Sequence, residues 1–185
     1  IRTTESSHKQ GVIALINAIH DRNPDDFYEH AYEGWYCVGC ELFKRENEIA
    51  DGKCVLHPTR DLQWTQERNW FFRLTHYSEF LKRLYAERPD FIQPESRRNE
   101  MLALLAAGLE DISVSRAGQD WGIPVPFDPS SVVYVWYDAL INYASAVGYG
   151  QNQALFDKWW PADLHLVGKD ITRFHCVVWP AMLMS

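Results

Sequence analysis

Four side chains in the first third of the chain restrict its fold more than any other feature: Cys37, Cys40, Cys54 and His57. Two residues separate the members of each pair, and thirteen residues separate the pairs. A tight turn within each pair lets both side chains converge on one ion, which is typical of zinc ribbons and knuckles. Few aliphatic residues surround the cluster, so burial alone would stabilise this region weakly.

We therefore predict a structural Zn²⁺ site with Cys37, Cys40, Cys54 and His57 as its four ligands. A structural zinc contributes on the order of 10 kcal/mol of apparent binding free energy, which offsets the small core. The alternative is that the three cysteines are reduced core residues and that His57 lies at the surface. Either reading indicates a reducing compartment rather than a disulfide scaffold, so we expect a cytoplasmic protein.

Composition excludes several classes of function. The net charge of −7 rules out non-specific nucleic-acid binding by a global positive field, although a local basic patch stays open. No apolar run approaches the ~20 residues of a membrane-spanning helix. The polar first twenty residues are unlike a secretory signal. We expect no membrane and no DNA partner.

Both ends of the 185-residue sequence suggest an interior segment of a longer protein. It opens at Ile1 without an initiator Met, and it stops after an apolar helical pattern that has no Gly or Asn cap. The alternative is a complete small protein with frayed ends.

Apolar spacing predicts the elements of the chain. The first half holds a helix at 5–21, an aromatic-rich strand and turn at 27–36, a strand at 70–74, and helices at 75–87 and 95–109. Short apolar runs at 112–115, 132–136 and 164–167 then alternate with helical patterns at 138–147 and 170–184. Strands that alternate with helices predict an α/β fold with a parallel sheet.

The apolar run Leu164–Val167 leads through Gly168 and Lys169 to Asp170 and a helix. Ligands of open α/β sheets bind beyond the carboxyl ends of strands, where Gly permits close approach and a carboxylate can hold ribose hydroxyls. Asp170 is equally suited to cap the helix. Both roles stay open for this residue.

Two stripes of side chains at helical spacing follow the last two expected strands. Their members are Trp136, Ala139, Leu140 and Tyr143, then Ile171, Phe174, His175, Trp179 and Met182. Core packing is the usual reason for such stripes. However, the Tyr, His and Trp polar groups each need a partner, so the stripes could instead line an apolar pocket with a few polar groups.

Several segments together resemble the methionyl-tRNA synthetase family of class I aminoacyl-tRNA synthetases. They are Ile1–Glu5, Tyr32–Cys40, Asn69–Leu74, Asp111–Arg116, Trp121–Pro126, Tyr134–Tyr143 and His165–Met184. The resemblance covers nearly the whole chain in the order of the family. It implies part of a Rossmann-like catalytic core, with a small α+β zinc-binding connective peptide inserted in it.

The resemblance also implies domains and residue roles. Residues 1–23 would end the first Rossmann half, 24–110 would form the connective peptide with its zinc knuckle at 37–57, and 111–185 would form the second half. Lining the methionine pocket would be Trp136, Ala139, Leu140, Tyr143, Ile171, Phe174, His175 and Trp179. Gly168 and Asp170 would lie along the adenosine of ATP, and Arg116 is a further candidate contact.

The family activates methionine with ATP, usually assisted by Mg²⁺, and transfers it to tRNA(Met). Its His-Ile-Gly-His and Lys-Met-Ser-Lys-Ser motifs are absent from this sequence, so we assign no catalytic residue and expect the chain alone to be inactive. Two alternatives remain at this stage. One is a non-catalytic zinc-knuckle module that binds RNA, and the other is a class I synthetase for another aliphatic amino acid.

Overall fold

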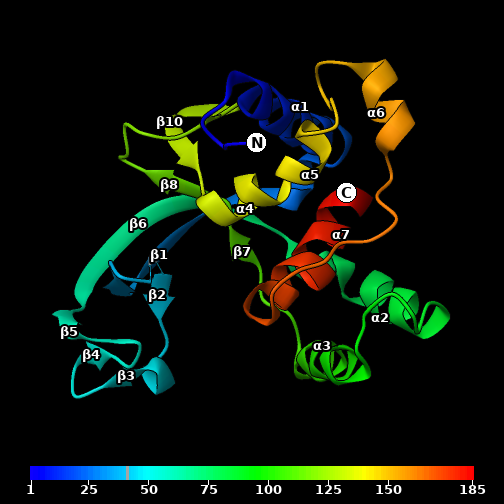
Figure 1. Ribbon diagram of the computed structural model, residues 1–185. Coiled ribbons are helices and arrows are strands. Elements are labelled where there is room, and N and C mark those ends of the chain that lie inside the picture. Colours follow the sequence, from blue (N-terminus) through cyan, green and yellow to red (C-terminus); the bar gives the residue numbers. More distant parts are fainter. Residues whose placement is uncertain (41) are drawn as a thin grey trace. The chain divides into compact units, whose positions relative to one another are not determined.

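The computed structural model describes residues 1–40 and 42–185 (Figure 1). Contacts within the chain separate two compact units: a main unit of residues 1–28 and 70–185, and a small unit of residues 29–69. Each unit has a hydrophobic cluster of its own. In the described part of the chain, no helix combines the length and apolarity needed to cross a membrane. The domain boundaries expected from the resemblance stay a prediction.

The small unit is built mainly from β-strands. Its first strand, β1 (Phe27–Cys37), confirms the predicted aromatic-rich strand and pairs antiparallel with β2 (Leu42–Lys44). The long strand β6 (Gln63–Phe72) neighbours β1 and extends the predicted strand at 70–74 toward the N-terminus. A three-stranded antiparallel sheet follows a short 3₁₀ turn, η2 (Glu46–Glu48), and consists of β3 (Ile49–Ala50), β4 (Lys53–Cys54) and β5 (His57–Asp61).

The main unit begins with α1 (Ser6–Arg22), which confirms the helix predicted from apolar spacing. Val12, Leu15, Ile16 and Ile19 all lie on its buried face, since they recur at helical spacing. The elements up to the middle of the chain also match their predicted positions. They are η3 (Leu74–Tyr77) with α2 (Ser78–Glu87), and α3 (Glu95–Ala107); a 3₁₀ turn that was not predicted, η1 (Pro24–Asp26), follows α1.

The second half of the main unit alternates short strands and helices, and the α/β class is confirmed. Its strands are β7 (Ile112–Ser113), β8 (Ser115–Ala117), β9 (Pro124–Val125) and β10 (Asp128–Val133). Its helices are α4 (Val135–Leu140), α5 (Asn142–Ser145), α6 (Gln153–Trp159), the 3₁₀ turn η4 (Lys169–Ile171), the π-helical turn η5 (Phe174–Val178) and α7 (Trp179–Met184).

Two details of the predicted strands are wrong. The strand expected at 132–136 ends at Val133, so Trp136 lies in α4. Leu164–Val167 forms no strand, and Leu164 and Leu166 are 78% and 93% exposed. An apolar run becomes a buried strand only where a neighbouring strand pairs with its backbone, and no described strand does so. Each pairing whose register is described is antiparallel, so the expected parallel pairing is not among these described pairs.

Contacts between helices bring the two predicted stripes of side chains together. The short helix α5 packs against α1, and α4 contacts both α5 and η5 (Figure 1). In η1, which follows α1, the buried Asp26 carboxyl accepts hydrogen bonds from the Tyr77 hydroxyl and, at 2.7 Å, from the Ser185 hydroxyl. This buried carboxyl therefore ties η1 to η3 and to the residue that follows α7.

Candidate functional site

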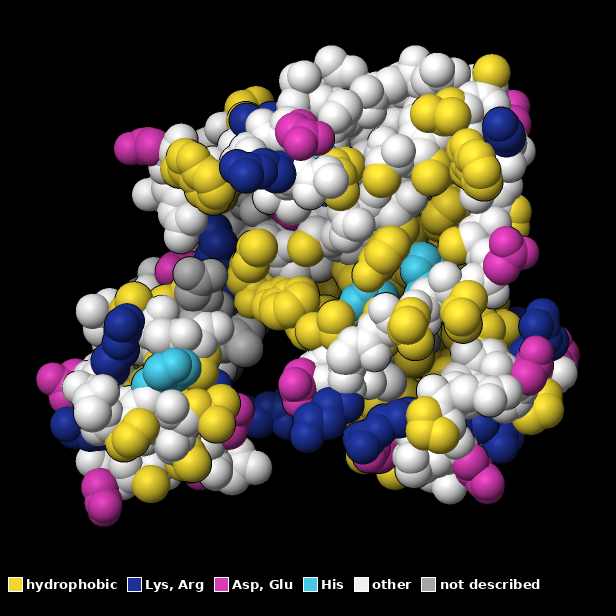
Figure 2. Space-filling view, viewed as in Figure 1, with side chains coloured by type: hydrophobic (Ala, Val, Ile, Leu, Met, Phe, Trp, Pro, Cys, Tyr) yellow, Lys and Arg dark blue, Asp and Glu magenta, His cyan; other side chains and the backbone are white. Residues whose placement is uncertain are grey.

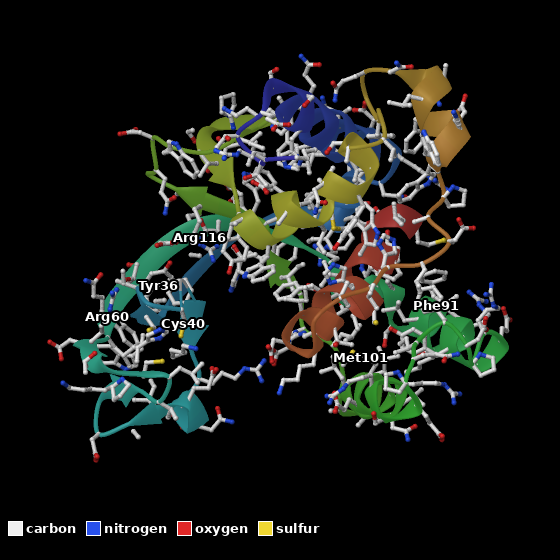
Figure 3. All side chains as sticks on the ribbon, in the orientation of Figure 1. Tyr36, Cys40, Arg60, Phe91, Met101 and Arg116 are labelled. Atoms are coloured by element: carbon white, nitrogen blue, oxygen red, sulfur yellow. The ribbon has the colours of Figure 1, made fainter. Side chains whose placement is uncertain are left out.

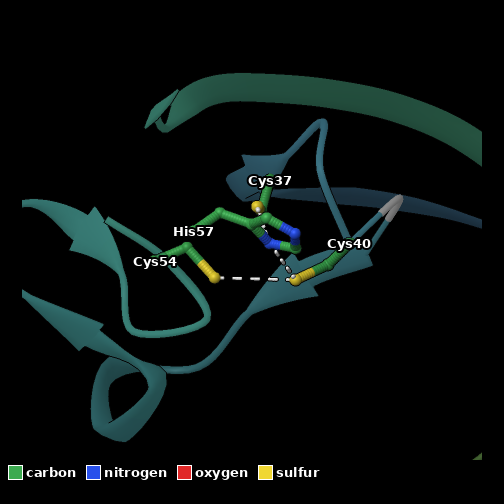
Figure 4. Close-up of side chains that lie close together, drawn as sticks. All are labelled: Cys37, Cys40, Cys54 and His57. Atoms are coloured by element: carbon green, nitrogen blue, oxygen red, sulfur yellow. Dashed lines mark hydrogen bonds between the residues drawn. The ribbon is translucent and has the colours of Figure 1, made fainter. Parts of the chain in front are cut away.

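The small unit brings all four predicted metal ligands together (Figure 4). Cys37 ends β1, Cys40 lies in the turn that follows, Cys54 ends β4, and His57 begins β5 opposite Cys54. Their ligand atoms all lie within 4.8 Å of one another. The alternative, in which His57 lies apart from three core cysteines, does not describe this arrangement.

Distances within the cluster fit a tetrahedral zinc site. The Cys40 Sγ lies 3.2 Å from His57 Nδ1 and 3.6 Å from Cys54 Sγ, and the Cys37 Sγ lies 3.7 Å from the same Nδ1. Zinc bonds of about 2.3 Å to sulfur and about 2.0 Å to nitrogen place neighbouring tetrahedral ligands roughly 3.5–3.8 Å apart. Cys37 and Cys54 are 1% exposed, so the cluster forms the centre of the small unit.

Electrostatics at the cluster differ between its thiols. Burial raises the pKa of Cys54. Hydrogen bonds from the Leu56 backbone, Cys40 and His57 have the larger, opposite effect, and together they lower this pKa to about 6. Burial and the neighbouring Cys54 raise the pKa of Cys40 to about 11. Metal binding requires thiolates, so a cation near Cys40 would assist it.

Lys44 is that cation. No local pattern indicates its role, because it lies on β2, outside the turn that holds Cys40. Its side chain is only 3% exposed, and its Nζ lies 3.4 Å from the Glu48 carboxylate. Burial lowers the pKa of Lys44, but a hydrogen bond with Cys40 and the charge of Glu48 outweigh burial and raise it. A buried ammonium beside three thiol ligands favours the net negative charge that a Cys₃His zinc centre carries.

The main unit brings the two predicted stripes together in a second candidate site. Trp136, Ala139 and Leu140 lie on α4, and Tyr143 lies on α5. Ile171 ends η4, Phe174 and His175 lie in η5, and Trp179 begins α7. Figure 2 shows hydrophobic and histidine side chains gathered at a recess over these elements. Leu140 and Trp179 are buried, whereas the other six side chains are half-buried.

Hydrogen bonds fix the polar groups of this site. The His175 Nδ1 lies 2.9 Å from the Ile171 carbonyl, which can only accept, so Nδ1 carries the hydrogen. In the neutral imidazole Nε2 is then an acceptor, and the Tyr143 hydroxyl donates to it at 2.7 Å. Burial raises the pKa of Tyr143, which keeps this hydroxyl protonated. The site thus presents one ordered hydroxyl–imidazole pair.

Aromatic rings surround that polar pair. The Trp136 and Phe174 rings stack with centroids 4.3 Å apart, and the Trp179 ring lies 6.3 Å from that of Tyr143. The Trp179 Nε1 is buried and has no hydrogen-bond partner among the described residues. A buried donor without a partner is rare, and a bound ligand is one way to satisfy it.

His165 also belongs to this cluster, although sequence reasoning did not select it. Its ring lies edge-on to Tyr143, with centroids 4.6 Å apart. Burial, with a smaller effect of the His175 charge, lowers the pKa of His165. The signal available in the sequence was a polar residue between the two leucines of an apolar run.

The predicted nucleotide contacts lie beside the aromatic cluster in the chain but are exposed. Gly168 has extended backbone and precedes η4, while Asp170 lies inside η4. Asp170 therefore does not cap this turn, which was one of its two predicted roles. An exposed carboxylate next to the aromatic cluster leaves the second role, contact with a ligand, as a prediction.

Arg116, labelled in Figure 3, is a buried cation of β8. Its guanidinium lies 3.9 Å from the centroid of the Tyr134 ring and donates to the Ser113 hydroxyl at 2.7 Å and to the Ser115 carbonyl at 2.8 Å. These contacts account for its burial within the sheet. A ligand contact by Arg116 stays a prediction.

Comparisons with known proteins find similar sequences along the whole chain. The family model of "tRNA synthetases class I (M)" matches residues 44–185. The methionine–tRNA ligase of Thermotoga maritima is 50% identical over all of this chain, and that of Caldanaerobacter subterraneus is 52% identical. The chain spans only about 30% of the length of these relatives.

Solved structures give the same result for the fold. The Mycobacterium tuberculosis methionyl-tRNA synthetase bound by methionyl-adenylate matches with a TM-score of 0.89 at 44% identity. The match covers the whole of this chain and 37% of that protein. The free-state structure of the same protein matches with a TM-score of 0.87.

Proposed function

The chain belongs to the methionine group of the class I tRNA synthetases, and on this premise we propose that it forms part of a methionine–tRNA ligase. In the proposed reaction the methionine carboxylate attacks the α-phosphate of ATP and pyrophosphate leaves. A hydroxyl of the terminal adenosine of tRNA(Met) then attacks the methionyl carbonyl of the adenylate, and AMP leaves. Identity of about 50% over the entire chain is the observation that carries the proposal.

The proposed methionine pocket consists of Trp136, Ala139, Leu140, Tyr143, Ile171, Phe174, His175 and Trp179. A thioether is apolar and polarizable, so aromatic walls suit it. Hydrocarbon walls discriminate one methylene by only about 1–3 kcal/mol, so selection of methionine needs polar groups near the sulfur. The ordered pair of Tyr143 and His175 supports this role, because its hydroxyl–imidazole geometry is fixed before a ligand binds.

ATP is proposed to lie along Gly168 and Asp170. The exposure of both residues and the extended backbone of Gly168 support this, because they leave room for a nucleotide. Mg²⁺, when bound with ATP, would neutralise charge on the phosphates. We assign no catalytic residue within this chain, since positioning and charge stabilisation suffice for adenylate formation without a covalent protein nucleophile.

A structural Zn²⁺ is proposed at Cys37, Cys40, Cys54 and His57. Four protein ligands leave no open position for water, so the ion would stabilise the small unit rather than react. The buried ammonium of Lys44 supports the proposal, because it offsets the net negative charge that Zn²⁺ with three thiolates and one neutral imidazole would carry. Thiolate ligands persist in a reducing compartment, which agrees with a cytoplasmic location.

The two alternative functions have less support. A zinc-knuckle RNA-binding module would not need the main unit with its aromatic cluster. A synthetase for another aliphatic amino acid would not explain why the family description and the two relatives reported above are of the methionine type.

Methionine-dependent exchange of pyrophosphate into ATP tests the proposal. We expect exchange with methionine, and much weaker exchange with leucine, from the complete protein that carries this sequence. The 185-residue chain alone should show none, because the two signature motifs of the family are absent from it. Equal exchange with leucine and methionine would refute the proposed specificity, and exchange by the chain alone would refute the assignment of catalysis to residues outside it.

A further inference from the structure

The main unit contains a fully buried histidine that the proposed function does not use. His8, on α1, has no exposed surface. Its Nδ1 lies 2.9 Å from the Ser145 hydroxyl on α5, and its Nε2 lies 3.7 Å from the Asp138 carboxylate oxygen on α4. Asp138 is only 9% exposed. One imidazole therefore connects three helices inside the core.

Two polar neighbours face this ring. The Ser145 hydroxyl shares a hydrogen bond with Nδ1. Nε2 faces the Asp138 carboxylate at 3.7 Å, a polar contact longer than a hydrogen bond, and neither of these two buried atoms has a hydrogen-bond partner among the described residues. Although a serine, a histidine and an aspartate also form hydrolytic triads, complete burial of His8 leaves no path for a substrate. The arrangement is suited to holding helices in place.

Close packing of α1 on α5 makes this contact possible. Gly11 lies one helical turn after His8, and a Cβ at Gly11 would lie 2.6 Å from the Ser145 Cβ. Real side-chain contacts are never so short, so α5 reaches its place only because this position is glycine. The same close approach brings the Ser145 hydroxyl within hydrogen-bond distance of His8.

Both partners of His8 lie on the helices that carry the aromatic cluster. Asp138 lies between Trp136 and Ala139 on α4, and Ser145 lies two residues after Tyr143 on α5. We propose that His8 is a positioning residue, whose imidazole fixes α4 and α5 so that Trp136 and Tyr143 form the methionine pocket. This inference rests on the proposed function, because it concerns the same pocket. A buried polar group with directional bonds fixes helix positions more narrowly than apolar contact does.

Three substitutions at His8 separate positioning from bulk stability. His8→Ala removes both contacts, His8→Asn keeps a polar group near the position of Nδ1, and His8→Gln keeps one near the position of Nε2. In the complete protein we expect His8→Ala to raise the KM for methionine by about tenfold in pyrophosphate exchange, with the KM for ATP within about twofold. Each amide variant should recover part of the loss.

Two further variants serve as a control and an independent perturbation. Ile16→Ala, at a buried position of the same helix, destabilises the core without touching the partners of His8. At a comparable loss of melting temperature it should leave the KM for methionine within about twofold. Gly11→Ala, which separates α1 from α5, should raise this KM as His8→Ala does.

The outcomes are distinct. An unchanged KM for methionine in His8→Ala, or an equal rise in His8→Ala and Ile16→Ala, would overturn the positioning role and leave the proposed function intact. If the unsubstituted protein shows no methionine-dependent exchange, the proposed function fails and the role of His8 fails with it. A selective rise with partial recovery by the amides supports the inference.

Discussion

Substitution of Gly39 by alanine should disrupt the metal centre without removing a ligand. Gly39 lies in the turn between Cys37 and Cys40, directly beneath the imidazole of His57. A Cβ at this position would lie 2.7 Å from His57 Cγ, 2.8 Å from Cδ2 and 3.0 Å from Nδ1. All three atoms belong to the ring that is expected to bind zinc, so the ring cannot stay where it is.

The size of the effect follows from these distances. Ordinary carbon contacts begin near 3.4 Å, so the ring has to move by about 0.7 Å. Zinc–ligand distances tolerate deviations of only about 0.2 Å, so such a movement weakens or breaks the bond to His57. Disturbing the orientation of a ligand typically costs about 10–100-fold in metal affinity, or about 1.4–2.8 kcal/mol.

Competition with a chromophoric zinc chelator at pH 7 would measure this loss in the complete protein. Val38→Ala is the matched control, because Val38 is adjacent in the same turn, is 45% exposed and has no contact role in the cluster. We expect the control to hold zinc as the unsubstituted protein does. If Gly39→Ala also binds zinc with unchanged affinity, the assignment of His57 as a ligand on this side of the turn is refuted.

Three further predictions concern the main unit. In the complete protein, His175→Ala and Trp136→Ala should each lower methionine-dependent pyrophosphate exchange by on the order of tenfold or more, and normal kinetics in both would remove the pocket assignment. Burial raises the pKa of Cys176 to about 11, so at pH 8 its thiolate fraction is about 100-fold or more below that of a free cysteine. Alkylation by iodoacetamide, followed by mass spectrometry, should therefore be slower by that factor. Rapid alkylation would contradict the burial of this thiol. Tyr77→Phe removes a hydrogen-bond donor to the buried Asp26 carboxyl and should destabilise the main unit by about 1–3 kcal/mol. An unchanged melting temperature in calorimetry would contradict this loss of stability.

Local spacing explains why the metal cluster could be predicted. The two ligands within each pair are close in sequence, so a turn at Gly39 and a short loop after Cys54 suffice to bring the members of each pair together. The aromatic stripes were also found from spacing, because helical periodicity determines which side chains share a face. Contacts between residues of different stripes, such as the stacking of Trp136 on Phe174, depend on how the helices pack, and sequence spacing does not encode this packing.

Features that depend on distant partners could not be predicted. His8 and Ser145 are 137 residues apart, and neither carries a local signal for the other. The apolar run Leu164–Val167 has the composition of a buried strand, but strand formation depends on a neighbour that the run itself does not specify. The same limit applies to Lys44, whose role depends on the fold of two strands around Cys40.

Exposure of Leu164 and Leu166 also has a consequence for handling the isolated chain. A segment outside any strand that exposes two leucines to water is a template on which a second molecule can add a strand. Preparations of this polypeptide should therefore self-associate as concentration rises, and replacing either leucine by lysine should suppress the association.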